Sequence, residues 1–217
     1  MKIPEVLAVG KMEGRHYLLM EYIDSTPPAT NYWEDFGHTL AKMHLEKTSK
    51  TYGFQHDNYI GKLPQPNRSD ESWIEFFILN RLEYQLNLAI TNHMVSGSFI
   101  DRYRKLYELL PGLLPGEKPS LLHGDLWSGN VMVGHNGKVC LIDPAVYYGH
   151  REIELAFTRM FGGFGEPFYH AYDEGYPLVP GFEERSRIYN IYPHMVHVNR
   201  FGTSYLSGVE QVLRKYV

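Results

Sequence analysis

The 217-residue sequence contains a single cysteine, Cys140, and no apolar run of the roughly 18 residues that a membrane-spanning helix needs. One cysteine excludes an internal disulfide framework and favours a reducing compartment. Residues 1–5 place a proline and an acidic side chain where a signal peptide requires an apolar stretch. These absences predict a cytoplasmic protein that has no contact with a membrane.

An excess of one charge is lacking as well, because 21 basic and 25 acidic side chains leave a net charge of −4. Without a basic surplus the sequence has no electrostatic signature of nucleic-acid binding. Apolar residues make up 43% of the sequence and charged residues 21%, as in ordinary folded globular proteins. The length fits one large domain or two small ones. We therefore expect local motifs to carry the function.

Apolar periodicity predicts a β hairpin followed by helices. The expected elements are a hairpin of residues 6–9 and 16–20, a helix over 33–44, an ordered loop over 50–70, a long helix from 73 to about 90, a helix over 98–110 that ends before Pro111, and further helices beyond 151. Ser72, followed three residues later by Glu75, is a capping-box signal for the start of the long helix. The pattern predicts a helix-rich α+β fold.

One stretch of polar residues points to chemistry. Two β-like runs flank Asn136-Gly137, a strong turn signal, and predict a second hairpin. Asn130 lies six residues before Asn136 and Asp143 six residues after Gly137, so we expect them to face each other at the open end. Asp125 lies on the loop that enters this end. Two carboxylates and one amide should therefore converge on one spot.

Phosphoryl transfer needs this set of side chains. An Asp accepts the proton of the attacking hydroxyl, while an Asn and a second Asp hold the Mg²⁺ that bridges the nucleotide phosphates. His123, Asp125 and Asn130 match the His-x-Asp-x-x-x-x-Asn spacing of kinase catalytic loops, and Asp143 follows the next hairpin. Gly124 replaces the arginine of protein kinases, as in small-molecule kinases. The alternative is a turn in which Asp and Asn serve as caps.

The interpretation of the chain as a kinase also gives a role to the residues at the end of the first hairpin. Residues 18–23 would be the strand and connector between two kinase lobes. The backbone of Glu21, Tyr22 and Ile23 would then bind the adenine edge of ATP, and Met20 would line the pocket. Without the catalytic loop, these residues are only the end of an edge strand.

The sequence resembles the fructosamine kinase (ketosamine-3-kinase) family along nearly its whole length. The matching segments are Leu-Leu-His-Gly-Asp-Leu-Trp-Ser-Gly-Asn at 121–130, Ile-Asp-Pro-Ala at 142–145, Tyr-Gly-His-Arg-Glu-Ile-Glu-Leu-Ala at 148–156, Met-Phe-Gly-Gly-Phe at 160–164, Tyr-Gly-Phe at 52–54, Pro-Gln-Pro-Asn at 64–67 and Trp-Ile-Glu-Phe-Phe at 73–77. Trp127 and the Phe-Gly-Gly-Phe segment separate the sequence from aminoglycoside and choline kinases.

The resemblance implies a protein-kinase-like fold of the aminoglycoside phosphotransferase type. Residues 1–24 would be a residual β hairpin of the N-terminal nucleotide-binding lobe with its hinge, and residues 25–217 the helical C-terminal lobe. The implied activity is ATP-dependent phosphorylation of the third-carbon hydroxyl of small or protein-linked ketosamines, which releases the amine in deglycation repair. Asp125 would be the proton acceptor, and Asn130 and Asp143 the magnesium ligands. Only seven residues separate Asp143 from Arg151, too few for a peptide-docking activation segment.

The sequence also departs from the family. Only Lys2 and Lys11 precede the connector, and no glycine-rich phosphate loop accompanies them. We therefore expect an N-terminally truncated member that catalyses poorly and self-associates through open strand edges. The alternatives are a non-catalytic pseudokinase-like binding module, another small-molecule kinase of the aminoglycoside or choline type, and a metal-dependent phosphoesterase, for which the needed Asp-x-His strand end is absent.

Three further expectations concern residues around the loop. His123 should orient the loop through backbone hydrogen bonds. Arg151 and Glu154 should form a pair that braces it. Tyrosines are candidates for the wall of a sugar site, namely Tyr52, Tyr59 and Tyr147.

Overall fold

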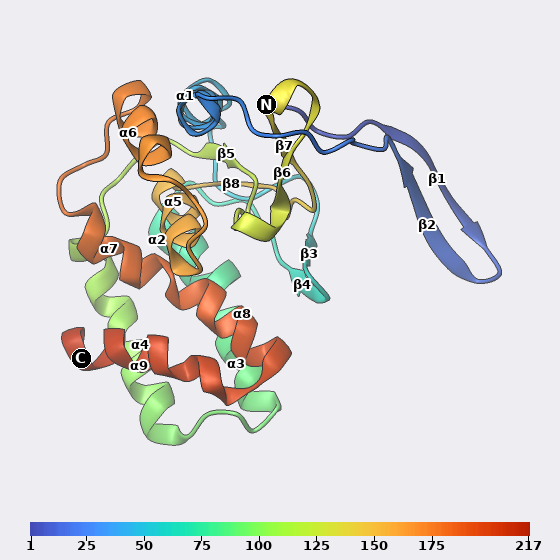
Figure 1. Ribbon diagram of the computed structural model, residues 1–217. Coiled ribbons are helices and arrows are strands. Elements are labelled where there is room, and N and C mark those ends of the chain that lie inside the picture. The colour runs from blue at the N-terminus through green and yellow to red at the C-terminus, as the bar shows by residue number, and fades with distance from the viewer.

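A two-stranded hairpin projects from a helical body in the computed structural model, which describes residues 1–217 (Figure 1). The helices are α1 (Tyr32–Glu46), α2 (Trp73–Phe76), α3 (Glu83–Thr91), α4 (Gly97–Leu113), α5 (Arg151–Met160), α6 (Glu166–Gly175), α7 (Phe182–Tyr189), α8 (Ile191–Phe201) and α9 (Leu206–Tyr216). Shorter helical turns are η1 (Phe77–Leu82), η2 (Ser128–Asn130), η3 (His135–Gly137) and η4 (Thr203–Tyr205). Helices and strands mix as the α+β prediction requires.

The strands form four separate antiparallel pairs. They are β1 (Val6–Met12) with β2 (Arg15–Met20), β3 (Asn58–Ile60) with β4 (Leu63–Gln65), β5 (Ser120–Leu122) with β8 (Tyr147–Gly149), and β6 (Val131–Val133) with β7 (Val139–Leu141). Because three of the four pairs have strands of only three residues, the helices supply most of the core.

The projecting hairpin confirms the first sequence prediction. Its two-residue turn uses Glu13 and Gly14 at φ 50° and 77°, the left-handed conformation that tight hairpins require. The chain before it is tied to the body, because Lys2 donates its backbone N–H to Val139 O (2.9 Å) and accepts from Leu141 N (3.0 Å). All six residues of β2 are exposed, so the ribbon has little cover of its own.

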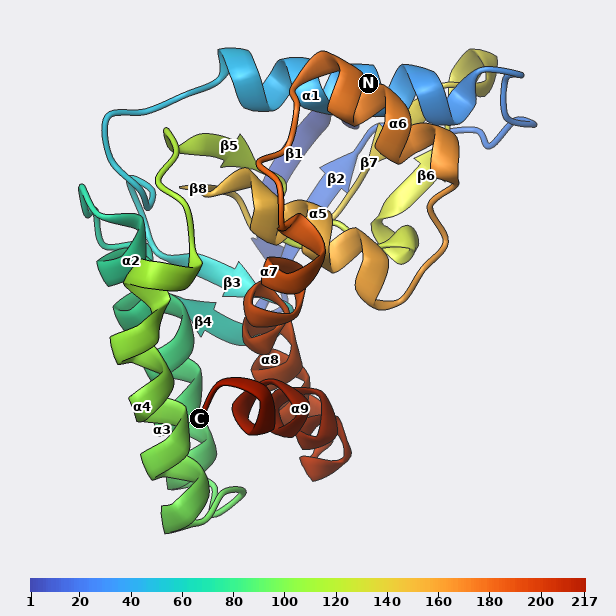
Figure 2. The ribbon, with the colours of Figure 1, turned by 90° about the vertical axis from the view of Figure 1, so that its left-hand side faces the viewer.

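The body divides into an upper and a lower group of helices (Figure 2). In the upper group α1 packs along α6, where Phe36, Leu40, Phe168 and Tyr172 are fully buried. Gly37 allows this close approach, because a Cβ there would collide with the backbone oxygen of Phe168. In the lower group α3, α4, α8 and α9 pack together. No helix has the length and apolarity needed to cross a membrane.

The predicted long helix is confirmed as the continuous run α2–η1–α3. Ser72 caps it, since its Oγ accepts from Glu75 N (3.3 Å). The reciprocal half of the capping box is replaced by Asp70, whose Oδ1 accepts from Ser72 N (2.8 Å). The middle of the run is a π-helix, η1, a distortion that sequence periodicity does not reveal.

Two predictions about local structure were wrong. The expected loop over 50–70 contains the β3–β4 hairpin, whose turn includes Gly61 at φ 59°. Three-residue strands are too short to show alternation. Helix α4 also runs through Pro111 to Leu113 instead of ending before the proline. Pro111 lies in the last turn, where its missing N–H removes one bond, and Leu114 N still closes the helix on Leu110 O (3.0 Å).

Candidate active site

The loop between β5 and β6 brings two of the predicted site residues together. The Asn130 side-chain Nδ2 donates to the backbone oxygen of Asp125 (2.8 Å) and to its carboxylate Oδ2 (3.0 Å). Asn130 is buried at the end of η2, so its position is well defined. Its amide oxygen and the second carboxylate oxygen of Asp125, Oδ1, remain for other partners.

The β6–β7 hairpin is present, but its predicted register was wrong by one residue. Val131 pairs with Leu141, and the connection spans five residues, closed by the bond from Gly134 N to Lys138 O (2.8 Å). An odd connection shifts the register, so Ile142 lies opposite Asn130 and donates its N–H to Asn130 O (3.1 Å).

Asp143 therefore lies one residue beyond the last bonded residue, Ile142, and is not opposite Asn130. Its side chain is exposed, and its backbone has a left-handed φ of 51°. A non-glycine residue in this conformation carries strain of roughly 1–3 kcal/mol, and such residues concentrate at functional sites. Pro144 follows it directly, so the turn away from β7 is rigid.

His123 orients the loop, as predicted. Its Nε2 donates to Ile142 O (2.9 Å), which leaves Nδ1 to accept the backbone N–H of Asp125 (3.3 Å). Since a carbonyl oxygen only accepts, these two bonds define the neutral tautomer with the proton on Nε2. The ring thus ties the loop to the end of β7.

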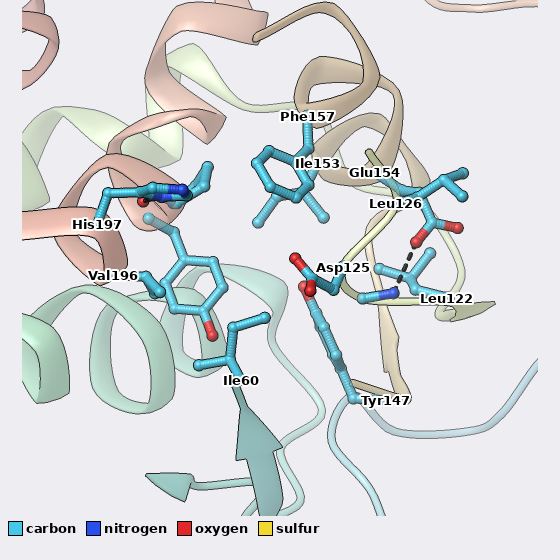
Figure 3. Close-up of a pocket in the computed structure, with 13 residues that line it drawn as sticks. Ile60, Leu122, Asp125, Leu126, Tyr147, Ile153, Glu154, Phe157, Val196 and His197 are labelled. Atoms are coloured by element: carbon cyan, nitrogen blue, oxygen red, sulfur yellow. Dashed lines mark hydrogen bonds between the residues drawn. The ribbon is translucent and has the colours of Figure 1, made fainter. Parts of the chain in front are cut away.

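Glu154, in α5, is the main support of the loop. Its carboxylate Oε1 accepts from His123 N (3.1 Å) and from His44 Nε2 (3.0 Å), and Oε2 accepts from Gly124 N (2.7 Å; Figure 3). Burial alone raises the pKa of Glu154, but the hydrogen bond and charge of His44 outweigh it and the pKa lies below its usual range. The carboxylate is therefore ionised and holds the backbone beside Asp125.

The predicted Arg151–Glu154 pair was wrong. The guanidinium of Arg151 binds Glu117 instead, with Nε 2.9 Å from Oε1. Gly124 was the one sequence feature that could have indicated that Glu154 binds the loop backbone. It has φ 81°, and a Cβ there would collide with Ala145 O, so only glycine lets the loop pass between Ala145 and Glu154.

Asp125 faces a groove between α5, α8 and the β3–β4 hairpin (Figure 3). A small space of about 30 Å³ lies beside its carboxylate, and an open cavity of about 310 Å³ adjoins it. The cavity is lined by Ile60, Trp127, Phe157, Phe161, Val196, His197, Arg200, Phe201 and Tyr205. Burial raises the pKa of Asp125, and the hydrogen bond from Asn130 and the charge of Arg200 offset this only in part.

The three candidate tyrosines lie in different surroundings. Tyr147 is buried and lines the space beside Asp125. Tyr52 is buried elsewhere and donates its hydroxyl to Glu117 O. Tyr59 is 65% exposed. Only Tyr147 is therefore in place to touch a ligand held by Asp125.

Comparison with known proteins identifies the family. The model of the fructosamine kinase family matches residues 1–217. The chain belongs to the fructosamine kinase family. "Probable ketoamine kinase VP1481" of Vibrio parahaemolyticus is 38% identical over 218 residues, covering 99% of this chain and 74% of that protein. "Protein-ribulosamine 3-kinase, chloroplastic" of Arabidopsis thaliana is 38% identical over 223 residues, covering 100% and 67%.

Solved structures agree with the family assignment. A crystal structure assigned as a fructosamine-3-kinase from Thermobifida fusca has a TM-score of 0.86 at 34% identity and covers 97% of this chain and 72% of that one. Aminoglycoside phosphotransferase APH(2'')-Ib has a TM-score of 0.59 at 14% identity, covering 98% and 75%. The predicted kinase-like fold of the aminoglycoside phosphotransferase type is thus confirmed for this fructosamine kinase family member.

In this family member the predicted connector leads from the projecting hairpin into the body. Met20 and Tyr22 are exposed, whereas Ile23 is buried against Gly134. The backbone N–H of Glu21 is bonded to Glu5 O (2.8 Å), but those of Tyr22 and Ile23 make no hydrogen bond within the chain. Two backbone donors are therefore available along the connector.

The donor chemistry of the predicted ligands, Asn130 and Asp143, fits a hard divalent cation. Mg²⁺ prefers carboxylate and carbonyl-type oxygens and keeps several waters. Asn130 offers its amide oxygen, because its nitrogen is committed to Asp125. Asp143 offers an exposed carboxylate. No cluster of three or more His, Cys, Asp or Glu side chains able to hold a metal lies anywhere in the chain, so the candidate ligands are one amide and one carboxylate.

We predict that Glu154→Gln lowers the free energy of unfolding by about 3 kcal/mol. The amide cannot serve as an ionised acceptor for three N–H groups, and hydrogen bonds to charged groups contribute about 1.5–3 kcal/mol each. Urea unfolding followed by circular dichroism measures the change. Glu174→Gln is the matched control, because Glu174 also contacts a histidine, His38 (3.2 Å), yet is exposed. The control should change stability by less than about 0.5 kcal/mol. Equal effects of the two substitutions would contradict the bracing role.

Proposed function

We propose that this chain transfers the terminal phosphoryl group of ATP to the third-carbon hydroxyl of ketosamines, with Asp125 as the general base. The observation that carries the proposal is the placement of Asp125 at the floor of a groove, on a loop braced by Glu154. The hydroxyl proton passes to Asp125, the oxygen–phosphorus bond forms, and ADP leaves. Oδ2 of Asp125 accepts from Asn130, which leaves Oδ1 for the hydroxyl.

The relatives support this substrate class. The names of the Vibrio and Arabidopsis proteins describe a ketoamine kinase and a protein-ribulosamine kinase. These names favour ketosamine phosphorylation over a pseudokinase-like binding module and over an aminoglycoside or choline kinase. A small or protein-linked ketosamine is the proposed partner.

The proposed cofactors are ATP and Mg²⁺. Asn130 and Asp143 would hold the ion, which would neutralise charge on the phosphates. The connector from Met20 to Ile23 would bind the adenine through its free backbone donors. The solved phosphotransferase APH(2'')-Ib is ADP-bound, which supports nucleotide use by this fold.

The same proposal divides the chain at the connector. Residues 1–24 would form part of the nucleotide-binding lobe and its hinge, and residues 25–217 the catalytic lobe. The hairpin stands apart from the body, whereas α1 packs against α6 and β5 of the body, which supports the division (Figure 1). We also propose a cytoplasmic location, because the only cysteine, Cys140, is buried and free.

We predict that Asp125→Asn lowers ketosamine turnover at least ~10²-fold, because an amide cannot accept the hydroxyl proton. Phosphorylated product is measured by mass spectrometry with protein, Mg²⁺, ATP and fructosyl-lysine at comparable concentrations, so that slow turnover is detected. Asp101→Asn, on the exposed side of α4, is the control and should match the parent. Parent-like turnover in Asp125→Asn would remove it from the base role. Ketosamine binding without turnover in the parent would favour the binding module.

We predict that Asp143→Asn raises the Mg²⁺ concentration needed for half-maximal turnover by about tenfold, because one charged ligand is lost. Titration with Mg²⁺ at fixed ATP measures the shift. Asp173→Asn removes the same charge from α6, outside the site, and should leave the titration unchanged. A titration of Asp143→Asn that superimposes on that of the parent would argue against its role as a ligand.

We predict concentration-dependent self-association through the exposed hairpin. Val9 is 72% and Leu18 53% exposed, and open strand edges recruit other chains. Val9→Lys should shift the protein toward the monomer in sizing chromatography with light scattering, because a lysine on an edge strand opposes pairing. Leu45→Lys on α1 replaces another exposed apolar side chain, outside the hairpin, and should not. A parent that stays monomeric at every concentration would overturn this prediction.

A further inference from the structure

Arg200 is a charged side chain in the groove with no assigned role. It lies in the last turn of α8 and lines the same cavity as Asp125, Trp127 and His197. Asp125 and Arg200 are the only Asp, Glu, Lys or Arg side chains in this lining. The groove therefore carries one carboxylate, at its floor, and one guanidinium elsewhere in the same lining.

The guanidinium of Arg200 has no hydrogen-bonding or ion-pair partner within the protein. It makes no side-chain hydrogen bond, and no carboxylate lies within 4 Å of it, whereas Arg102 and Arg104 each bind a glutamate. Its donors thus remain available to a ligand. Arginine presents these donors as a planar fork that matches the two oxygens of a carboxylate or phosphate.

Two contacts restrain this fork on one side. The guanidinium carbon lies 4.8 Å from the centre of the Phe201 ring. The group also rests against Gly61 in the β3–β4 turn, where any Cβ would collide with it. Because packing restrains the side chain before a ligand arrives, less rotamer entropy is lost on binding.

The geometry points to Arg200 as a subsite for an anionic group on the amine part of the substrate. We propose that the chain prefers ketosamines whose amine substituent carries a carboxylate or a phosphate, an inference that rests on the proposed function. The sugar hydroxyl lies at Asp125, and the substituent extends past the aromatic wall to Arg200. A cavity of about 310 Å³ is near the lower limit for small-molecule sites, which suits a low-molecular-weight adduct.

The test compares matched charged and neutral adducts. Fructosyl-glycine is set against fructosyl-glycinamide, and fructosyl-phosphoethanolamine against fructosyl-ethanolamine. We expect kcat/KM and the binding constant to be about tenfold more favourable for the charged member of at least one pair. The pair that discriminates identifies carboxylate or phosphate as the ligand. Because the side chain is exposed, added salt should reduce the preference.

Arg200→Gln should reduce the charged-to-neutral ratio to near one, and Arg200→Lys should restore part of it. Arg187→Gln is the matched control, since it removes an exposed arginine from α7 outside the groove and should keep the parent ratio. Equal losses for both adducts in Arg200→Gln, a parent without preference, or an effect confined to the KM for ATP would overturn the subsite.

Calorimetry without ATP separates the subsite from the proposed function. Charge-selective binding that depends on Arg200, without phosphorylation of any ketosamine, would preserve the subsite and reject the kinase proposal. Phosphorylation without charge selectivity would reject the subsite and leave the kinase proposal in place.

Discussion

Three N–H groups converge on the buried carboxylate of Glu154, and the geometry of the site depends on this convergence. A buried charge costs several kcal/mol unless donors surround it, so α5 and the loop must meet in one arrangement. His44 extends the link, because its other ring nitrogen, Nδ1, lies 2.8 Å from the hydroxyl of Tyr172 in α6. One carboxylate thereby ties α1, α5 and α6 to the two residues before Asp125.

The same helix directs other charges inward. Glu152 pairs with Arg185 of α7, with its Oε2 2.8 Å from the Arg185 Nε, and Arg151 reaches Glu117 before β5. All residues of 151–158 are buried. Each pair links α5 to a segment remote in sequence, and truncating either partner leaves an uncompensated charge in the interior. These pairs therefore make the placement of α5 specific, and because Glu154 lies in α5, its carboxylate is held in one position.

Local sequence signals predicted most helices and strands, but they did not predict which side chains pair between distant parts of the chain. The spacing of His123, Asp125 and Asn130 indicated the loop, and apolar periodicity indicated α1 and the α2–η1–α3 run. The partner of Glu154 was not predictable in the same way, because spacing within α5 suggested Arg151. Neighbouring charges on one helix select their partners from the rest of the fold, which a single sequence does not reveal.

The register of the β6–β7 hairpin marks a second limit. Asn136-Gly137 is the strongest two-residue turn signal, and both residues do adopt left-handed φ values, 58° and 67°. The connection nevertheless spans five residues, and Gly137 within it packs closely against the backbone at Ala29 and Pro27. Contacts of this kind with remote segments are not visible in the turn signal, which is why it did not predict the displacement of Asp143 by one residue from Asn130.

The charges of the groove suggest how a substrate would be oriented. A ketosamine nitrogen is a secondary amine that carries a proton at neutral pH. An adduct whose amine substituent carries a carboxylate or a phosphate is therefore a zwitterion. Asp125 at the floor attracts the ammonium side of such a molecule, and Arg200 attracts its anion. Opposite charges in one groove thus favour one direction of entry, and the reverse orientation places like charges together. In the proposed reaction, this orientation would present the sugar hydroxyls, rather than the substituent, to Asp125.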